Sequence, residues 1–325
     1  MTAHRVVDRR IVDPFAIPAD TEMLDRIMAD VEASGGSLAP NEHWTLGRDQ
    51  VGSLDAMLDP LIGCIGMQPV DADAVACYEP FLRGIDHLGL CKNDLLAQSR
   101  SRGWIKSDLG TLMDLNLITA YLPAPLPERL SVVEVGGGYG RLAEGLLRLL
   151  PGGVHHLLID AVPGSLMYAY LYLRRVFPRR RIGSFYAGDA YDPDFDCYVM
   201  PAWRSARLLD GVFDLAVNIE SMQEMSAGHV EYYSSLFDRV TRPEAEIYIS
   251  NARDYVYQGE WNFPTRWEVL FMHNTPRSWS RCHPTVVMRK GPADYRLERR
   301  VHEAAFATEM PHWSPRLSML RPGSA

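Results

Sequence analysis

The chain has 325 residues, of which 47% are hydrophobic and 23% are charged, and its formal net charge is −8. This composition is typical of a globular protein with a large core and about two domains. The net negative charge argues against non-specific nucleic-acid binding, which needs clustered Lys and Arg, and the lack of an 18-residue apolar run argues against a membrane-spanning helix.

The N-terminal stretch MTAHRVVDRR carries charges where a signal peptide would need an apolar run, which favours a cytoplasmic protein. The five cysteines are dispersed and odd in number, and they form no C-x-x-C pair. This spacing disfavours a disulfide framework and a zinc site. We expect the cysteines to be small core residues.

The first third of the chain predicts helices. Residues 20–32 carry apolar side chains at helical spacing behind Asp20, a typical start signal, and residues 75–85 repeat the pattern. Ser107 predicts the cap of another helix. The proline-rich stretch 122–127 then reads as a linker. We expect residues 1–125 to form a helical cap or lid, which can also serve as the contact of a homodimer.

Strands and helices alternate after the linker. A strand at 130–135 leads into glycines and a helix, and a strand at 154–159 ends in Asp160 before Pro163 opens the next helix. The third strand lies at either 182–187 or 198–200.

The pattern continues to residue 290. Strands at 212–217 and 245–249 flank a helix at 231–240, and residues 267–272 and 285–288 suggest an antiparallel pair. The fold class predicted is therefore α/β: a Rossmann-like, doubly wound, mostly parallel sheet with an antiparallel last strand. This domain spans residues 126–290, and a C-terminal tail at 291–325 stays unassigned.

The segment Gly136-Gly137-Gly138-Tyr139-Gly140 lies between the first strand and its helix, where parallel sheets bind ligands. A dinucleotide fingerprint, G-x-G-x-x-G, would require glycine where this chain has Arg141. The observed pattern is instead Glu134-x-Gly136-x-Gly138-x-Gly140, with Asp160 at the end of the second strand. Tight packing of the turn is the alternative explanation for the glycines.

This arrangement resembles the first two signature elements of class I methyltransferases that use S-adenosyl-L-methionine. The resemblance implies that the loop, including Tyr139, approaches the amino acid part of that cofactor. It also implies that Asp160 accepts hydrogen bonds from the ribose diol. Glu134 would orient the loop or meet the cofactor's ammonium group.

The stretch FDLAVNIESMQEM at 213–225 narrows the resemblance. Together with LIDAVPGSLMYAYLYLRRVFP, IYISNARDY and HPTVVMRK, it is similar to a family of sugar O-methyltransferases from bacterial saccharide and natural-product clusters, over about residues 100–290. This resemblance implies methyl transfer to a hydroxyl of a sugar-like or other polar small molecule. N-methyl transfer, or cofactor binding by a catalytically inactive regulatory or scaffold protein, are the alternatives.

In that family the fourth strand leads into an N-x-x-S-x-Q-E-M run. The resemblance assigns Asn218 to the cofactor side, and Ser221 and Gln223 to the acceptor. Trp261 is a further candidate for the acceptor site, because aromatic rings after the fifth strand can stack on the apolar faces of sugars, and packing in the core is the alternative for it. An acceptor hydroxyl needs a base, for which Glu224, Glu220, His273 and His229 are the candidates. The alternative is structural: Glu224 caps the next helix and the histidines are packed.

The last prediction concerns residues after the third strand. Asp189 would meet the adenine amino group if that strand is 182–187, whereas Pro201 and Trp203 would take this place if it is 198–200. Asp189 also begins an acidic cluster that extends to Asp196, and oxygen ligands of this kind suit Mg²⁺ or Ca²⁺. Because loop carboxylates are usually just solvated, we expect no metal.

Overall fold

The computed structural model of this chain describes residues 20–35, 38, 82–89, 106–122, 127–150, 153–251, 264, 266–275 and 283–291. The predicted tail after residue 291 therefore lies outside the described residues. None of the described helices is long and apolar enough to span a lipid bilayer.

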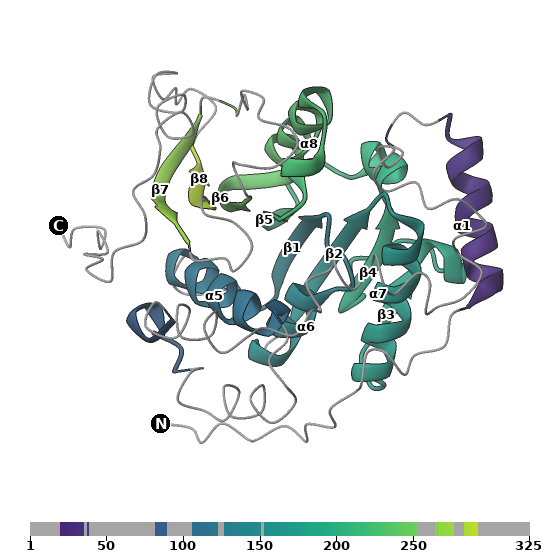
Figure 1. Cartoon of the computed structure of the whole chain (residues 1–325), viewed down its shortest axis with the longest axis horizontal. Coiled ribbons are helices and arrows are strands. Elements are labelled where there is room, and N and C mark those ends of the chain that lie inside the picture. The colour runs from purple at the N-terminus through teal and green to yellow at the C-terminus, as the bar shows by residue number, and fades with distance from the viewer. Residues whose placement is uncertain are drawn as a thin grey trace.

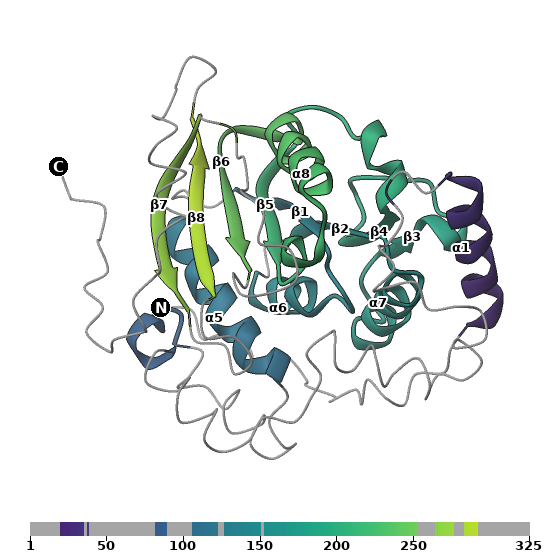
Figure 2. The same cartoon turned by 45° about the horizontal axis from the view of Figure 1, so that its top comes forward.

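In this part of the chain, eight strands form one sheet in the order β3-β4-β2-β1-β5-β6-β8-β7 (Figures 1 and 2). Neighbouring strands from β3 to β6 are parallel, whereas β8 is antiparallel to both β6 and β7. The predicted fold class is thereby confirmed. The strands are β1 (Leu130–Val135), β2 (Val154–Asp160), β3 (Ile182–Ser184), β4 (Cys197–Pro201), β5 (Phe213–Ile219), β6 (Thr241–Ser250), β7 (Trp267–Asn274) and β8 (Pro284–Lys290).

Helices cover both faces of the sheet (Figures 1 and 2). The helices α5, α6 and α7 lie on one face and α8 on the other. Successive strand residues point to opposite faces, so Val132 packs into the first core and Val133 into the second. The helices are α1 (Thr21–Ala33), α5 (Lys106–Tyr121), α6 (Arg141–Leu149), α7 (Pro163–Val176) and α8 (Ala227–Val240), with short 3₁₀ turns η3 (Phe185–Ala187), η4 (Ala202–Arg207) and η5 (Met222–Glu224).

Local signals explain where several helices begin. The Asp20 carboxylate accepts the Met23 N–H at 2.9 Å, and Pro163 is the first residue of α7, as the sequence predicts. The predicted cap at Ser107 is wrong because α5 already begins at Lys106, which places Ser107 inside the helix.

Both candidates for the third strand contain a strand, although the first, predicted at 182–187, is a strand only at Ile182–Ser184 and continues as the turn η3. β4 pairs with β2 on one side and with β3 on the other, so the three-residue β3 is an edge strand. The segment beside β2 is therefore the later one, and its carboxyl end at Pro201 lies next to Asp160.

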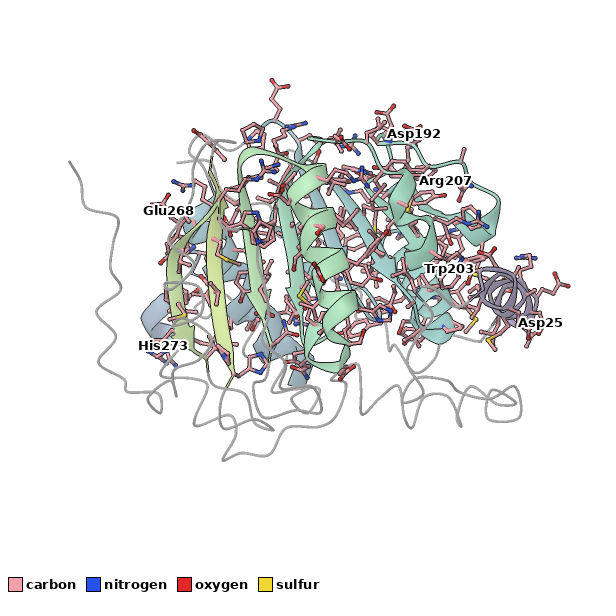
Figure 3. All side chains as sticks on the ribbon, turned by 90° about the horizontal axis from the view of Figure 1, so that it is seen from above. Asp25, Asp192, Trp203, Arg207, Glu268 and His273 are labelled. Atoms are coloured by element: carbon pink, nitrogen blue, oxygen red, sulfur yellow. The ribbon has the colours of Figure 1, made fainter. Side chains whose placement is uncertain are left out.

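The N-terminal helices share the core of the sheet. Ile27 of α1 and Met113 of α5 are fully buried, in the same hydrophobic cluster as Val132. α1 is further tethered by Asp30, whose carboxylate accepts hydrogen bonds from Trp203 Nε1 at 2.7 Å and Tyr186 Oη at 2.9 Å. Figure 3 shows Trp203 beside α1.

Candidate functional site

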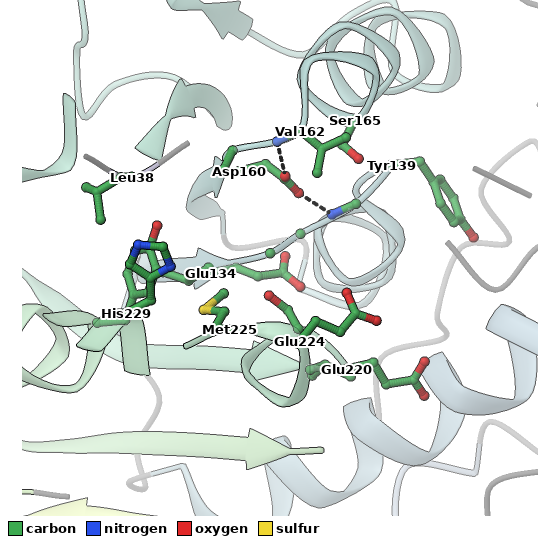
Figure 4. Close-up of a pocket in the computed structure, with 18 of the residues that line it drawn as sticks. Leu38, Glu134, Tyr139, Asp160, Val162, Ser165, Glu220, Glu224, Met225 and His229 are labelled. Atoms are coloured by element: carbon green, nitrogen blue, oxygen red, sulfur yellow. Dashed lines mark hydrogen bonds between the residues drawn. The ribbon is translucent and has the colours of Figure 1, made fainter. Parts of the chain in front are cut away.

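A pocket lies at the carboxyl ends of β1, β2 and β5 (Figure 4). Its lining comes from the glycine loop after β1, the end of β2, the turn after β5 and the start of α8. Leu38, which follows α1, adds to the lining. This is the edge of a parallel sheet where ligands are expected to bind.

The glycine loop needs bare backbone for two different reasons. A Cβ on Gly136 would lie 2.0 Å from Ser221 Oγ, so the absence of a side chain lets the turn after β5 pack against the loop. Gly138 has φ of +55°, a left-handed conformation that suits glycine, and its N–H points to Asp160. Tight packing therefore explains Gly136, and the close approach of main chain to a carboxylate explains Gly138.

Asp160 ends β2 and faces the pocket. One carboxylate oxygen accepts the Gly138 N–H at 3.1 Å and the other accepts the Val162 N–H at 2.8 Å (Figure 4). Burial raises the pKa of Asp160 to about 6, although these backbone hydrogen bonds oppose the increase and the nearby Glu134 adds to it. The Asp160 carboxylate is thus a hydrogen-bond acceptor held between two loops. With a pKa of about 6, it changes its ionisation state close to neutral pH.

Glu134 lies on β1 in the floor of the pocket and is only 3% exposed. Its Oε2 lies 2.8 Å from Nε2 of His156, a fully buried residue of β2 whose Nδ1 has no hydrogen-bond partner. With Nε2 as the donor, His156 fixes the orientation of the Glu134 carboxylate. Sequence reasoning did not identify this pair, because the contact joins neighbouring strands.

The end of β5 is held by a network of two asparagines. Fully buried Asn218 donates to the Val135 carbonyl at 2.9 Å and accepts from the Met222 N–H at 3.1 Å, so it joins β5 to β1. Asn251, which follows β6, donates to Asn218 at 2.9 Å and accepts the Ser221 N–H at 3.0 Å. Asn218 thus positions the turn and does not itself line the pocket.

The turn after β5 brings carboxylates to the pocket. Glu220 and Glu224 both line it, together with Ser221 and with His229 of α8 (Figure 4). Glu220 has φ of +54°, a backbone conformation that costs a residue with a side chain about 1–2 kcal/mol. Its N–H donates to the Ser250 carbonyl at 2.8 Å, which holds this conformation in place.

Several predicted site residues lie away from the pocket lining. Gly140 is the N-cap of α6, Gln223 is a buried residue of the turn η5, and the Asp189 carboxylate accepts the Ser184 N–H at 3.1 Å near the β3 edge. His273 lies on the edge strand β7 (Figure 3), and Trp261 lies outside the described residues. Glu134, Gly136, Gly138, Tyr139, Asp160, Glu220, Ser221 and Glu224 do line the pocket.

The acidic cluster that begins at Asp189 forms ion pairs. Arg181 contacts Asp192 at 3.2 Å and Asp194 at 3.8 Å, and Arg180 contacts Asp196 at 3.3 Å. Among the described residues, no group of three or more metal-binding side chains converges.

The described lining of the pocket has more negatively than positively charged side chains. Its lining contains the carboxylates of Glu134, Asp160, Glu220 and Glu224. Arg141 is the only lysine or arginine among the described lining residues, and it pairs with Asp114 at 2.9 Å. A pocket with this excess of negative charge attracts cationic ligands and repels phosphates.

No family model and no curated protein matches the sequence. Among solved structures, a SAM-dependent methyltransferase from Aquifex aeolicus aligns with a TM-score of 0.38 and 14% identity, over 54% of this chain and 87% of its own. One from Methanosarcina mazei gives 0.38 and 16%, over 56% and 98%. A geranyl diphosphate methyltransferase, solved with GPP and sinefungin, gives 0.36 and 11%, over 57% and 83%. With scores and identities this low, functional conclusions must come from the pocket's own residues.

Proposed function

We propose that this chain is an S-adenosyl-L-methionine-dependent methyltransferase that acts on a hydroxyl of a sugar-like or other polar small molecule. The observation that carries the proposal is the Asp160 carboxylate, held between the Gly138 and Val162 N–H groups at the end of β2 and facing the pocket. A carboxylate in this position can accept both hydrogen bonds of a ribose diol.

The other lining groups fit the same donor. S-adenosyl-L-methionine carries a sulfonium and an ammonium group, both of which suit a pocket rich in carboxylates. We assign the ammonium group to Glu134, which His156 orients. A dinucleotide would instead bring two phosphates to a lining that carries four carboxylates and, among its described residues, one arginine.

The chain's own residues would position the acceptor and remove its proton. When bound, S-adenosyl-L-methionine supplies a methyl group that moves to the acceptor oxygen as the carbon–sulfur bond breaks and the carbon–oxygen bond forms. Glu224 is our first choice for the base that takes the hydroxyl proton, and Glu220 is the second. His273 lies on β7 outside the lining, so we do not assign proton removal to it, whereas His229 of α8 lines the pocket and is the third candidate.

An amine acceptor is the second candidate. The observation that favours it is the same carboxylate excess, because an ammonium group would be attracted to Glu220 and Glu224. We also propose that the N-terminal region covers the pocket, since Leu38 already contributes to its lining.

Calorimetry tests cofactor binding directly. We expect S-adenosylhomocysteine and S-adenosyl-L-methionine to bind the purified protein, and we expect no heat from NAD. Mass spectrometry of the protein as purified should detect either adenosyl compound if it is retained. Binding of NAD without binding of the adenosyl compounds would contradict the proposal.

Turnover is tested by release of S-adenosylhomocysteine in the presence of matched acceptors, such as a sugar and the corresponding amino sugar. Methylation of the sugar would support the hydroxyl acceptor, whereas methylation of the amino sugar at nitrogen alone would favour the second candidate. We expect Glu224→Gln to lower kcat at least a hundredfold while cofactor affinity changes little. Cofactor binding without methylation of any acceptor would point to a regulatory or scaffold protein.

A further inference from the structure

Arg141 lines the pocket without a role in the proposal above. It is the first residue of α6, directly after the glycine loop, and its side chain is 15% exposed. It is also the only lysine or arginine among the described lining residues. A single arginine in an otherwise acidic lining is the one described place there where a negatively charged group of a ligand would meet a guanidinium.

The guanidinium of Arg141 is fixed by contacts to α5. Its Nη1 donates to Asp114 Oδ2 at 2.9 Å and to Thr111 Oγ1 at 3.1 Å. Asp114 is fully buried, and its other oxygen accepts the Tyr248 hydroxyl of β6 at 2.7 Å. Two elements, α5 directly and β6 through Asp114, thus hold Arg141 in place at the pocket, which reduces the entropy lost when this arginine binds a ligand.

Arg141 and Asp160 reach the pocket from different elements. Asp160 ends β2, whereas Arg141 directly follows the glycine loop and is held against α5 by Asp114. A ligand whose ribose lies at Asp160 and whose other end follows the glycine loop would bring that end to Arg141. In S-adenosyl-L-methionine, this other end is the amino acid, which carries a carboxylate.

We propose that Arg141, positioned by Asp114, binds the carboxylate of the methionyl part of the methyl donor. This inference rests on the proposed function. Guanidinium and carboxylate groups match in geometry as well as in charge, which makes arginine the side chain best suited to this contact. The buried Asp114 partner keeps the guanidinium in one orientation before the ligand arrives.

The test compares S-adenosyl-L-methionine with its decarboxylated form, which keeps the sulfonium and ammonium groups but lacks the carboxylate. Calorimetry on the wild-type chain should show about tenfold tighter binding of the complete donor. Arg141→Gln should weaken binding of the complete donor by about the same factor and leave binding of the decarboxylated form unchanged. Arg141→Lys should give an intermediate loss for the complete donor.

Arg148→Gln is the matched control, since Arg148 lies on the same helix and forms an ion pair with Glu144 outside the pocket lining. Arg148→Gln should leave the affinities for the complete and the decarboxylated donor unchanged. Equal affinities of the wild-type chain for the two donors would overturn the inference. It would also be overturned if Arg141→Gln lost the same amount of affinity for both donors. If the wild-type chain binds neither donor, the proposed function itself fails.

Discussion

At the scale of single residues, the proposed cofactor contact of Asp160 predicts that binding depends on pH. The free carboxyl group has a pKa of about 6, and ribose hydroxyls that donate to it would stabilise the ionised form. Affinity for S-adenosylhomocysteine should therefore be high above pH 6 and weaken by about tenfold between pH 7.5 and pH 5. Calorimetry across this range measures the effect. Asp160→Asn should bind weakly at every pH and show a flat profile, and a flat profile in the wild-type chain would contradict the prediction.

Gly138 offers a test that separates backbone strain from cofactor binding. Its φ is +55°, and that of Gly188, which does not line the pocket, is +84°. Alanine at either position should lower the free energy of unfolding by about 1–2 kcal/mol, as measured with urea. Only Gly138→Ala should also weaken binding of S-adenosylhomocysteine. Equal affinity in the two variants would mean that Gly138 serves the turn alone.

Predictability from sequence differs among the site residues for a physical reason. Glu134, Gly138 and Asp160 are placed by strand ends and by a local turn. Hydrophobic periodicity reveals the strand ends in the sequence, and the run of glycines reveals the turn. The roles of Asn251 and His156 depend on which strands become neighbours, and no local pattern carries that information.

At the scale of elements, one carboxylate joins α1 to the rest of the molecule. Burial alone would raise the pKa of Asp30, but hydrogen bonds from Trp203, Tyr186 and Arg204 outweigh this effect and lower the pKa. The stability that Asp30 contributes is therefore present above its unfolded pKa of about 3.9 and is lost as pH falls through the lower folded value.

We expect Asp30→Asn to lower the free energy of unfolding at pH 7 by about 1–3 kcal/mol, because three donors lose a charged acceptor. The difference from the wild-type chain should shrink in acid. Urea unfolding at pH 7 and pH 3 measures both effects. Asp25→Asn, at an exposed position of the same helix, is the control and should change little. A constant difference at both pH values would count against the ion pair.

The elements themselves were predictable where hydrophobic periodicity is strong. The sequence predicted β1 at the observed bounds and β2 to within its last residue, because each is a short segment rich in Val, Leu and Ile between turn signals. The third strand stayed ambiguous because β3 has only three residues and pairs on one side with β4 alone. Only the sheet order decides which segment lies beside β2.

At the scale of the whole molecule, a buried carboxyl group links global stability to pH. Glu246 of β6 is 1% exposed, and neither of its side-chain oxygens has a hydrogen-bond partner. Burial raises its pKa well above the usual value, although Arg289 of β8 opposes the increase; Tyr121 of α5 is the other titratable group close to it. The folded state therefore keeps a proton that the unfolded chain releases, and stability falls as pH rises from about 4.5 through the folded pKa.

Glu246→Gln keeps the shape of the side chain but cannot ionise. Relative to the wild-type chain, this variant should gain roughly 1–3 kcal/mol in free energy of unfolding between pH 5 and pH 8. Urea titrations at several pH values measure the gain. Glu244→Gln, at an exposed position of the same strand, should show no such trend. Parallel curves for Glu246→Gln and the wild-type chain would show that Glu246 ionises equally in both states.

The missing side chain at Gly136 also ties two segments of the pocket wall together. Ser221 occupies the space that a Cβ would take, so the turn after β5 packs directly against the glycine loop after β1. Asn218 joins the same two strands through its hydrogen bond to the Val135 carbonyl. A larger residue at position 136 would therefore displace the turn that carries Glu220 and Glu224 as well as the loop itself.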